Sequence, residues 1–291
     1  MRPGSGTDII YWSPQHVALR RLLKGVVPED LLPLVPSSFD IIGSRQGAVA
    51  VLEIPEELEP YKIEIARAVK SLNKNIGAVI RRKGARSGPY RLYSYEVLIE
   101  GPTEVVHKEH GYLIKVDPTK VYFSPRDQTD RAEIADAVRD GERVLYLFAG
   151  VGPYAVAIAK RRKVRWIYSV ELNPWGFKYM VENVRLNKLN AVVPVRADVA
   201  DFCVAFNARA DRALMTLPLG AHEYLDLVLK CVEDGGYLHF YHTGPEEDPF
   251  GEAESLLKSS CPGCLVVNKR IVRDYAPHIY KIRIDVQVRR T

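Results

Sequence analysis

Glycines and acidic residues along the chain have the types and order of a nucleoside-binding site. Gly150 and Gly152 stand between an apolar run that ends at Phe148 and a helical pattern that begins at Pro153. Glycines at such a turn let a ligand approach the backbone closely, and the N–H groups of the next helix can bind a carboxylate or phosphate. Pro153 suits the first helical turn, because its missing N–H is not needed there. The turn, Phe148 included, therefore predicts a ligand site at the start of the helix.

Two carboxylates follow at the ends of the next two predicted strands. Glu171, with Leu172 after it, ends the first, and a carboxylate there can accept hydrogen bonds from both ribose hydroxyls. Asp198, with Val199 after it, ends the second and is placed to bind an adenine amino group. Either acid alone could be a surface residue or a helix cap. The glycine turn and the two acids in this order predict a nucleoside cofactor.

NAD is the rival cofactor, because the glycine turn together with Ala155 also fits the dinucleotide fingerprint. A dinucleotide site needs only the glycines and one acid, whereas this chain adds Asp198. Thr216 and Pro218 end the fourth predicted strand, where methyltransferases that act on ring or exocyclic nitrogens hold the target base. These additions favour S-adenosylmethionine over NAD.

A mostly parallel sheet is needed to bring these residues together. From about residue 129, strand and helix patterns alternate, which implies βαβ units and an α/β fold. Ligands of such sheets bind at the carboxyl ends of the strands, beside the point where the strand order reverses. The predicted strands are 143–148, 165–170, 192–196, 212–216, 236–241 and 280–286, and the predicted helices are 130–138, 153–160, 174–186 and 221–231.

The residues before the alternating pattern have a different texture. Short β-branched runs alternate with turn residues and are interrupted by one helical rhythm at 60–71. We therefore expect three parts: a helical N-terminal segment at 1–38, a small α+β domain at 39–128, and the α/β domain at 129–291.

The composition indicates a folded protein of the cytoplasm. The chain has 291 residues, of which 47% are hydrophobic and 26% charged, so a sizeable core is expected and disorder is not. The sequence has neither an apolar run long enough to span a bilayer nor the apolar stretch of a signal peptide near Met1. We expect no membrane association and a monomer.

Basic and aromatic residues are mixed in one stretch of the small domain. Side chains of these two kinds can neutralise phosphates and stack on unpaired bases, although a solvated strand-loop-strand would look the same. The formal net charge of +5 is by itself weak support for a polyanionic partner. The stretch contains Lys70, Lys74, Arg81, Arg82, Lys83, Arg86 and Arg91, with Tyr90, Tyr93 and Tyr95.

The four cysteines give no metal site. Cys203 and Cys231 are most simply core thiols. Cys261 and Cys264 have the spacing of metal ligands, but no second Cys or His pair accompanies them in the sequence, so no metal is expected. A local disulfide and two free thiols both remain open for this pair.

Several short strings make the chain resemble one family. They lie at 36–43, 54–58, 120–126, 148–153, 173–174, 217–218 with 221–222, and 273–278. With these strings the chain, from about Leu31 to its C-terminus, resembles the archaeal and eukaryotic tRNA (guanine-37) N1-methyltransferase family. The resemblance implies a Rossmann-like, class I catalytic domain, S-adenosylmethionine as cofactor, and a small preceding domain that helps to hold the tRNA anticodon stem-loop.

The resemblance also implies roles for individual residues. Asp130 stands where the family has a Glu that acts as general base, and capping of the helix is the other interpretation. Arg91 resembles the Arg that contacts the target guanine, or contacts a phosphate instead. Tyr122, Phe123 and Arg126 resemble cofactor or loop contacts. In the expected reaction, Asp130 takes the proton of guanine N1 as N1 attacks the methyl group, and Arg91 stabilises the charge that develops on O6.

Three departures from the family pattern bear on the target and the rate. Asp130 is one methylene shorter than Glu, Thr216 replaces an Asn, and Tyr146 replaces an acidic residue. The family's extra N-terminal module is expected to be absent or reduced to a helical stub. The alternatives are a wybutosine-pathway enzyme, which transfers an aminocarboxypropyl group or methylates a tricyclic guanine derivative, and a tRNA-binding relative without catalysis.

Overall fold

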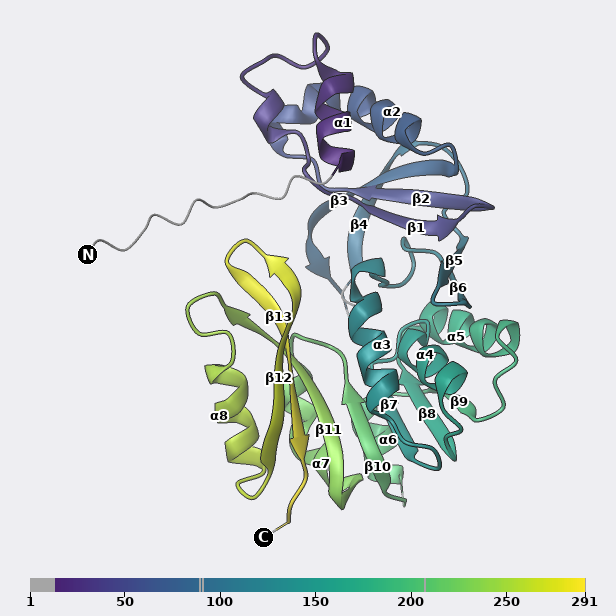
Figure 1. Ribbon diagram of the computed structural model, residues 1–291, viewed down its shortest axis with the longest axis vertical. Coiled ribbons are helices and arrows are strands. Elements are labelled where there is room, and N and C mark those ends of the chain that lie inside the picture. Colours follow the sequence, from purple (N-terminus) through teal and green to yellow (C-terminus); the bar gives the residue numbers. More distant parts are fainter. Residues whose placement is uncertain (1–13, 89, 91, 207, 291) are drawn as a thin grey trace, which may run out of the picture. The chain divides into compact units, whose positions relative to one another are not determined.

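The computed structural model describes residues 14–88, 90, 92–206 and 208–290. These residues form two compact units, which are best followed one at a time (Figure 1). The first unit contains 14–87 and 93–106, and the second contains 88, 90, 92 and the described residues from 107 onward. Both units combine helices and strands, and the predicted fold class is confirmed.

The first unit is a four-stranded sheet with helices. The sheet has the order β1-β2-β3-β4, in which β2 is antiparallel to β1 and parallel to β3. Apolar residues of α2, Ile65, Ala66 and Val69, are fully buried in the core of this unit. Its elements are α1 (Pro14–Leu23), β1 (Asp40–Ser44), β2 (Gly47–Leu52), α2 (Lys62–Leu72), β3 (Ile76–Ser87) and β4 (Leu92–Ile99), with 3-10 helices η1 (Leu32–Leu34) and η2 (Glu56–Tyr61).

The second unit is built on a seven-stranded sheet of order β12-β13-β11-β10-β7-β8-β9. Strands β7 to β11 run parallel, and β13 is antiparallel to both of its neighbours. The strand order reverses between β7 and β10, so ligands are expected beside that point. The strands are β7 (Arg143–Leu147), β8 (Trp166–Glu171), β9 (Val192–Arg196), β10 (Ala210–Met215), β11 (Val232–Pro245), β12 (Leu265–Ala276) and β13 (Ile279–Gln287).

Helices of the second unit pack on the sheet and on one another. Helices α6, α7 and α8 bury apolar side chains in the core with β10, β11 and β13, and α3 packs against α4 (Figure 1). The helices are η3 (Pro125–Asp127), α3 (Gln128–Ala137), α4 (Pro153–Arg161), α5 (Pro174–Leu186), α6 (Val199–Ala205), η4 (Ala221–Tyr224), α7 (Leu225–Lys230) and α8 (Gly251–Ser260).

The first unit ends at residue 106, whereas the sequence predicted that the small domain would end at 128. A hairpin begins at this division. The hairpin is formed by β5 (Val105–Glu109) and β6 (Tyr112–Val116). The backbone N–H of Lys115 donates to Asn183 Oδ1 at 2.6 Å, and that of Leu113 to Asn187 Oδ1 at 3.0 Å. These buried amides, one on α5 and one at its C-cap, bind β6 to the rest of the second unit.

Strand β13 has two chemically different faces. Ile282 and Ile284 are fully buried in the apolar core, whereas Lys281, Arg283 and Asp285 alternate with them and are also buried. Because successive side chains of a strand point to opposite faces, the charged side chains point away from the apolar core, to the other face of the sheet. There Lys281 pairs with Asp127 of η3, and Arg283 pairs with Asp130 of α3.

Two of the four cysteines form a disulfide, and the other two are free thiols. Cys261 and Cys264 form a disulfide at the end of α8, which resolves the alternatives left by the sequence. Cys203 and Cys231 are buried free thiols, as predicted. In the described part of the chain, no three potential metal ligands are grouped, and no helix has the length and apolar character to cross a membrane.

Candidate active site

The glycine turn follows β7 with three residues in the left-handed backbone region. Gly150 has φ +56° and Gly152 has φ +81°, and Gly152 is the N-cap of α4. A Cβ on Gly152 would lie 2.9 Å from Cγ of Met180, so a larger residue does not fit there. Phe148 has φ +58°, a costly conformation for a residue with a side chain, and its ring packs against Tyr224 at 5.4 Å between centroids. Such strain is typical of functional sites.

Glu171 is fixed against this turn. Its Oε2 accepts a hydrogen bond from the N–H of Gly150 at 2.6 Å, and its Oε1 accepts one from the N–H of Asn173 at 2.7 Å. Burial raises the pKa of Glu171, and these backbone hydrogen bonds oppose the rise. Each carboxylate oxygen can accept a second hydrogen bond, so Glu171 fits a pair of ribose hydroxyls.

Asp198 lies at the end of the next strand, as expected, and also caps a helix. Its Oδ1 accepts a hydrogen bond from the N–H of Ala200 at 2.7 Å, at the N-cap of α6. The second oxygen, Oδ2, can still accept from an adenine amino group. Leu172 is 43% exposed and can cover a ligand, whereas Val199 belongs to the apolar core. Glu171 and Asp198 together fit the two polar ends of an adenosine.

The segment before α3 lies against the glycine turn and against the loop that follows β8. The carbonyl oxygen of Tyr122 is 3.6 Å from where a Cβ on Gly150 would stand, and Asn173 Nδ2 donates to the carbonyl of Lys120 at 2.9 Å. Phe123 is buried between His107, at 5.3 Å between ring centroids, and Arg131. Tyr122 is therefore beside the candidate cofactor site, whereas Phe123 supports it from the interior.

Arg126 is exposed in η3, just before α3, and its N–H donates to Ser124 Oγ at 3.3 Å. The role predicted for Arg126 as a cofactor or loop contact stays a prediction.

Asp130 is buried in a network of hydrogen-bond donors. Its Oδ2 accepts from the hydroxyls of Tyr154 and Tyr241, both at 2.6 Å, and its Oδ1 is paired with Arg283. Only 2% of Asp130 is exposed. Burial and the charge of Asp130 raise the pKa of Tyr154 and of Tyr241, so both hydroxyls stay protonated donors. Asp127, not Asp130, is the N-cap of α3. Through these contacts Asp130 links α3 to Tyr154 of α4, Tyr241 of β11 and Arg283 of β13.

The segment after β10 is tied to the glycine turn. The hydroxyl of Thr216 donates to the carbonyls of Leu147 and Phe148, both at 3.3 Å. Pro218 is buried two residues later, at the carboxyl end of β10. Tyr146, the residue in place of the family's acid, is buried and packs edge-on against Tyr154 at 5.5 Å. Thr216 and Pro218 are thus adjacent to the candidate cofactor site.

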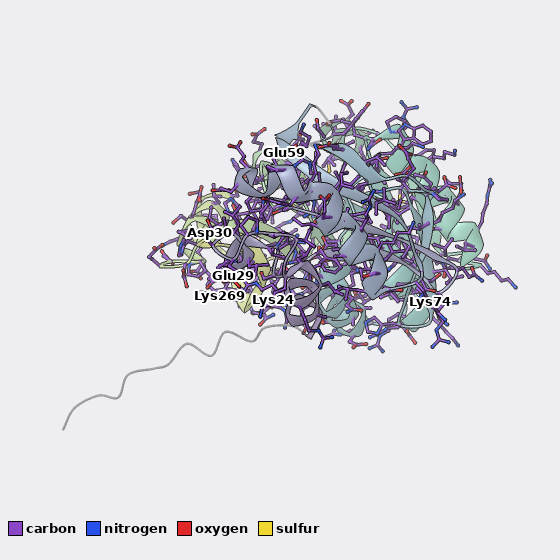
Figure 2. The ribbon with its side chains drawn as sticks, turned by 90° about the horizontal axis from the view of Figure 1, so that it is seen from above. Lys24, Glu29, Asp30, Glu59, Lys74 and Lys269 are labelled. Carbon is purple, nitrogen blue, oxygen red and sulfur yellow. A yellow bond between two sulfur atoms is a disulfide. The ribbon has the colours of Figure 1, made fainter. Side chains whose placement is uncertain are left out.

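Two arginines of the basic stretch in the first unit are paired internally. Arg81 donates to Glu59 and Glu96, and hydrogen bonds from Arg81 and Lys62 lower the pKa of Glu59 to about 2. Glu59 is one of the side chains labelled in Figure 2. Arg82 is paired with Asp40 at 2.8 Å and with Glu53 at 2.7 Å. Lys74 and Lys83 remain exposed. Arg91 lies outside the described residues.

Three partners of Asp130, namely Tyr154, Tyr241 and Arg283, were absent from the candidate residues drawn from the sequence. The alternation of charged and apolar residues in β13 was the one available signal, because it predicts a second buried face. The carboxyl ends of β7, β8, β9 and β10 bring the glycine turn, Glu171, Asp198 and Thr216 to one edge of the sheet.

Comparison with known proteins shows the family of the chain. The sequence profile described as the TRM5/TYW2 methyltransferase domain matches residues 105–266, and that of the TYW2 N-terminal domain matches 19–103. The chain is 40% identical to the tRNA (guanine(37)-N(1))-methyltransferase Trm5b of Pyrococcus abyssi over 90% of this chain and 78% of the relative. The crystal structure of that protein superposes with a TM-score of 0.80, covering 91% of this chain and 78% of the other.

Two further relatives extend the comparison. The tRNA(Phe) (4-demethylwyosine(37)-C(7)) aminocarboxypropyltransferase of Pyrococcus horikoshii is 31% identical over 93% of this chain and 96% of its own length. The structure of Methanocaldococcus jannaschii Trm5 in complex with adenosine is 31% identical, covers 94% of this chain and 79% of the other, and has a TM-score of 0.78. The chain belongs to the TRM5/TYW2 methyltransferase family.

Proposed function

We propose that this chain is an S-adenosylmethionine-dependent tRNA methyltransferase that forms N1-methylguanosine at position 37, beside the anticodon. The observation that carries the proposal is the carboxylate of Glu171, which two N–H groups hold beside the glycine turn. It occurs in a chain that is 40% identical to a tRNA (guanine(37)-N(1))-methyltransferase.

Each residue at the sheet edge would bind a different part of the cofactor. Glu171 would accept from the ribose hydroxyls, Asp198 would accept from the adenine amino group, and Gly150 and Gly152 would let the ligand approach the backbone. Tyr122 would close the site from the segment that packs on Gly150. When bound, the cofactor supplies an electrophilic methyl group on a sulfonium.

The target base would lie beside Thr216 and Pro218, at the carboxyl end of β10. Guanine N1 carries a proton and is a poor nucleophile until that proton leaves, so a base near N1 would accelerate the reaction. Asp130 occupies the family position of this base and is proposed for it. Because its oxygens already accept from Tyr154, Tyr241 and Arg283, it can take a proton only if one of these contacts opens.

The tRNA would approach as an anticodon stem-loop. Lys74 and Lys83 are exposed cations of the described residues that can neutralise phosphates. Arg81 and Arg82 contribute less, since each already has two carboxylate partners. The target base must leave its stack to be reached.

The proposal is tested by incubating the full chain with S-adenosylmethionine that carries a labelled methyl group and with a tRNA transcript that has guanosine at position 37. We expect label in the first transcript and none in a matched transcript with adenosine at that position. Equal labelling of both transcripts, or none in either, would contradict the proposed target.

A second candidate is the aminocarboxypropyl transfer of the wybutosine pathway. It is favoured by one observation: the chain matches the aminocarboxypropyltransferase of Pyrococcus horikoshii over 96% of that protein's length, and its first unit matches the TYW2 N-terminal domain. The two reactions use different carbon–sulfur bonds of the same sulfonium, so a label on the methyl group reaches the tRNA only in methylation. Methylation of 4-demethylwyosine, the activity named for a relative from Saccharolobus solfataricus, is tested with tRNA that already carries that base.

A further inference from the structure

One arginine of the C-terminal hairpin contacts two residues that precede α3. Arg273, on β12, donates from Nη2 to the hydroxyl of Tyr122 at 2.7 Å and from Nε to Asp127 Oδ1 at 2.7 Å. Its Nη1 donates to the carbonyl of Asp274 at 2.8 Å. All three guanidinium nitrogens are therefore used, and their planar arrangement suits several fixed acceptors at once.

Asp127 is the anchor on which this contact rests. It is 3% exposed, and its Oδ2 accepts from Lys281 Nζ at 2.8 Å while Oδ1 accepts from Arg273. Burial alone would raise the pKa of Asp127, but the positive charges of Lys281 and Arg273 outweigh it and hold the pKa below the ordinary value. Asp127 is thus a buried carboxylate compensated by two cations, and this fixes Arg273 at one end.

Tyr122 links this anchor to the candidate cofactor site. Its carbonyl lies against Gly150, and the neighbouring Lys120 carbonyl accepts from Asn173, whose N–H binds Glu171. The hydroxyl of Tyr122 accepts a hydrogen bond from Arg273. The backbone of Tyr122 therefore lies at the sheet edge, and its side chain is tied to the hairpin.

We propose that Arg273 is a positioning residue for the cofactor site, which acts by holding the hydroxyl of Tyr122 while it is itself anchored on Asp127. This inference rests on the proposed function, because Tyr122 is placed at the cofactor only there. It gives a physical reason for the string at 273–278, which the sequence singled out without a role. Arg273 touches neither cofactor nor target base, and its effect reaches the cofactor through Tyr122.

The test compares Arg273→Lys, Tyr122→Phe and the double variant in the full chain. A lysine keeps the charge near Asp127 but offers one nitrogen in place of the three that the guanidinium uses, and phenylalanine removes only the hydroxyl. The affinity for S-adenosylhomocysteine, the product that remains after methyl transfer, is measured by calorimetry. Arg270→Lys is the matched control, because Arg270 is also on β12 and pairs with Glu133 of α3 at 2.6 Å, away from Tyr122.

We expect Arg273→Lys and Tyr122→Phe each to weaken S-adenosylhomocysteine binding by about three- to tenfold, the usual effect of one hydrogen bond. The double variant should be no weaker than the worse single variant, because both changes break the same contact. The KM for the cofactor should rise more than kcat falls, and Arg270→Lys should bind as the wild type does.

Unchanged affinity in both single variants would overturn the positioning role, as would additive losses in the double variant. If Arg273→Lys does not fold, an unchanged affinity in Tyr122→Phe alone has the same consequence. A wild-type chain that binds no S-adenosylhomocysteine would instead refute the proposed cofactor and, with it, this inference. A wild-type chain that binds the product without methylating tRNA would refute the proposed reaction and leave the positioning measurement decisive.

Discussion

Asp130→Asn is the substitution for which the structure makes the sharpest prediction. Asparagine keeps the shape, and its Oδ1 can still accept from Tyr154 and Tyr241, but its Nδ2 then faces Arg283 as donor against donor. Removing one partner of a buried ion pair typically costs about 3–5 kcal/mol. Arg283 keeps Asp285 at 2.9 Å and Glu133 at 3.7 Å, so we expect a loss of about 2–4 kcal/mol, below the usual range.

The loss is measured by urea denaturation of the wild type and the variant. With a denaturant dependence of about 2 kcal/mol per molar urea, the midpoint should fall by about 1–2 M. Trp166, packed on Tyr168 in the second unit at 4.9 Å between ring centroids, gives a fluorescence signal from that unit. Asp136→Asn is the control on the same helix, since its exposed pairs with Arg161 and Arg162 should contribute less than about 1 kcal/mol.

Two results would refute this reasoning. One is an unchanged midpoint in Asp130→Asn. The other is a further loss when Arg283→Met is added, because replacing the whole buried pair by apolar or neutral groups should recover much of the stability. If the folded Asp130→Asn protein also methylates at the wild-type single-turnover rate, Asp130 is not the general base. If the rate falls by about 10²-fold or more, the base role is supported.

Three further predictions concern other parts of the site. Glu171→Ala should weaken S-adenosylhomocysteine binding by about 1.5–3 kcal/mol in calorimetry. Because burial raises the pKa of Glu171, binding by the wild type should also weaken as the pH falls through that raised pKa. If binding by the Glu171→Ala variant depends on pH to the same degree, the assignment of Glu171 is contradicted. Gly152→Ala should destabilise the fold by more than about 1 kcal/mol in urea denaturation, since the added Cβ meets Met180 at a left-handed φ, and an unchanged midpoint would count against this packing. Changing Lys74 and Lys83 to Glu should weaken tRNA binding and lower the log–log salt slope by roughly one per lost phosphate contact, whereas an unchanged slope would make them merely solvated.

The sheet edge could be predicted from the sequence because its signals are local. Gly150 and Gly152 are needed by the left-handed backbone at those positions, and Glu171 and Asp198 lie at the ends of β8 and β9. The alternation of strands and helices then places these residues at one edge, since the carboxyl ends of parallel strands share it.

The surroundings of Asp130 could not be predicted, because its partners are distant in the sequence. Tyr241 and Arg283 reach it from β11 and β13, across more than a hundred residues. The family resemblance gave Asp130 a position in a reaction, but only the packing shows how completely its oxygens are used. A carboxylate one methylene shorter than Glu stays closer to its own helix, which accords with its place in this network.

The basic stretch was only partly readable for a similar reason. Arg81 and Arg82 are indistinguishable in sequence from solvated cations, yet acidic residues of η2, β1 and β4 or of the loop after β2 neutralise them. Strand β12 and helix α8 were not predicted from the sequence. Strand β12 is an edge strand that is mostly exposed, so it lacks the alternation of a half-buried strand.

Nucleoside mass spectrometry tests the central claim most directly. Transcripts with guanosine at position 37 are incubated with the full chain and S-adenosylmethionine, digested to nucleosides and compared with a standard of N1-methylguanosine. The account predicts a new nucleoside that is heavier than guanosine by one methyl group and that co-elutes with the standard. An aminocarboxypropyl adduct, a methyl group elsewhere on the base, or unmodified guanosine alone would contradict it.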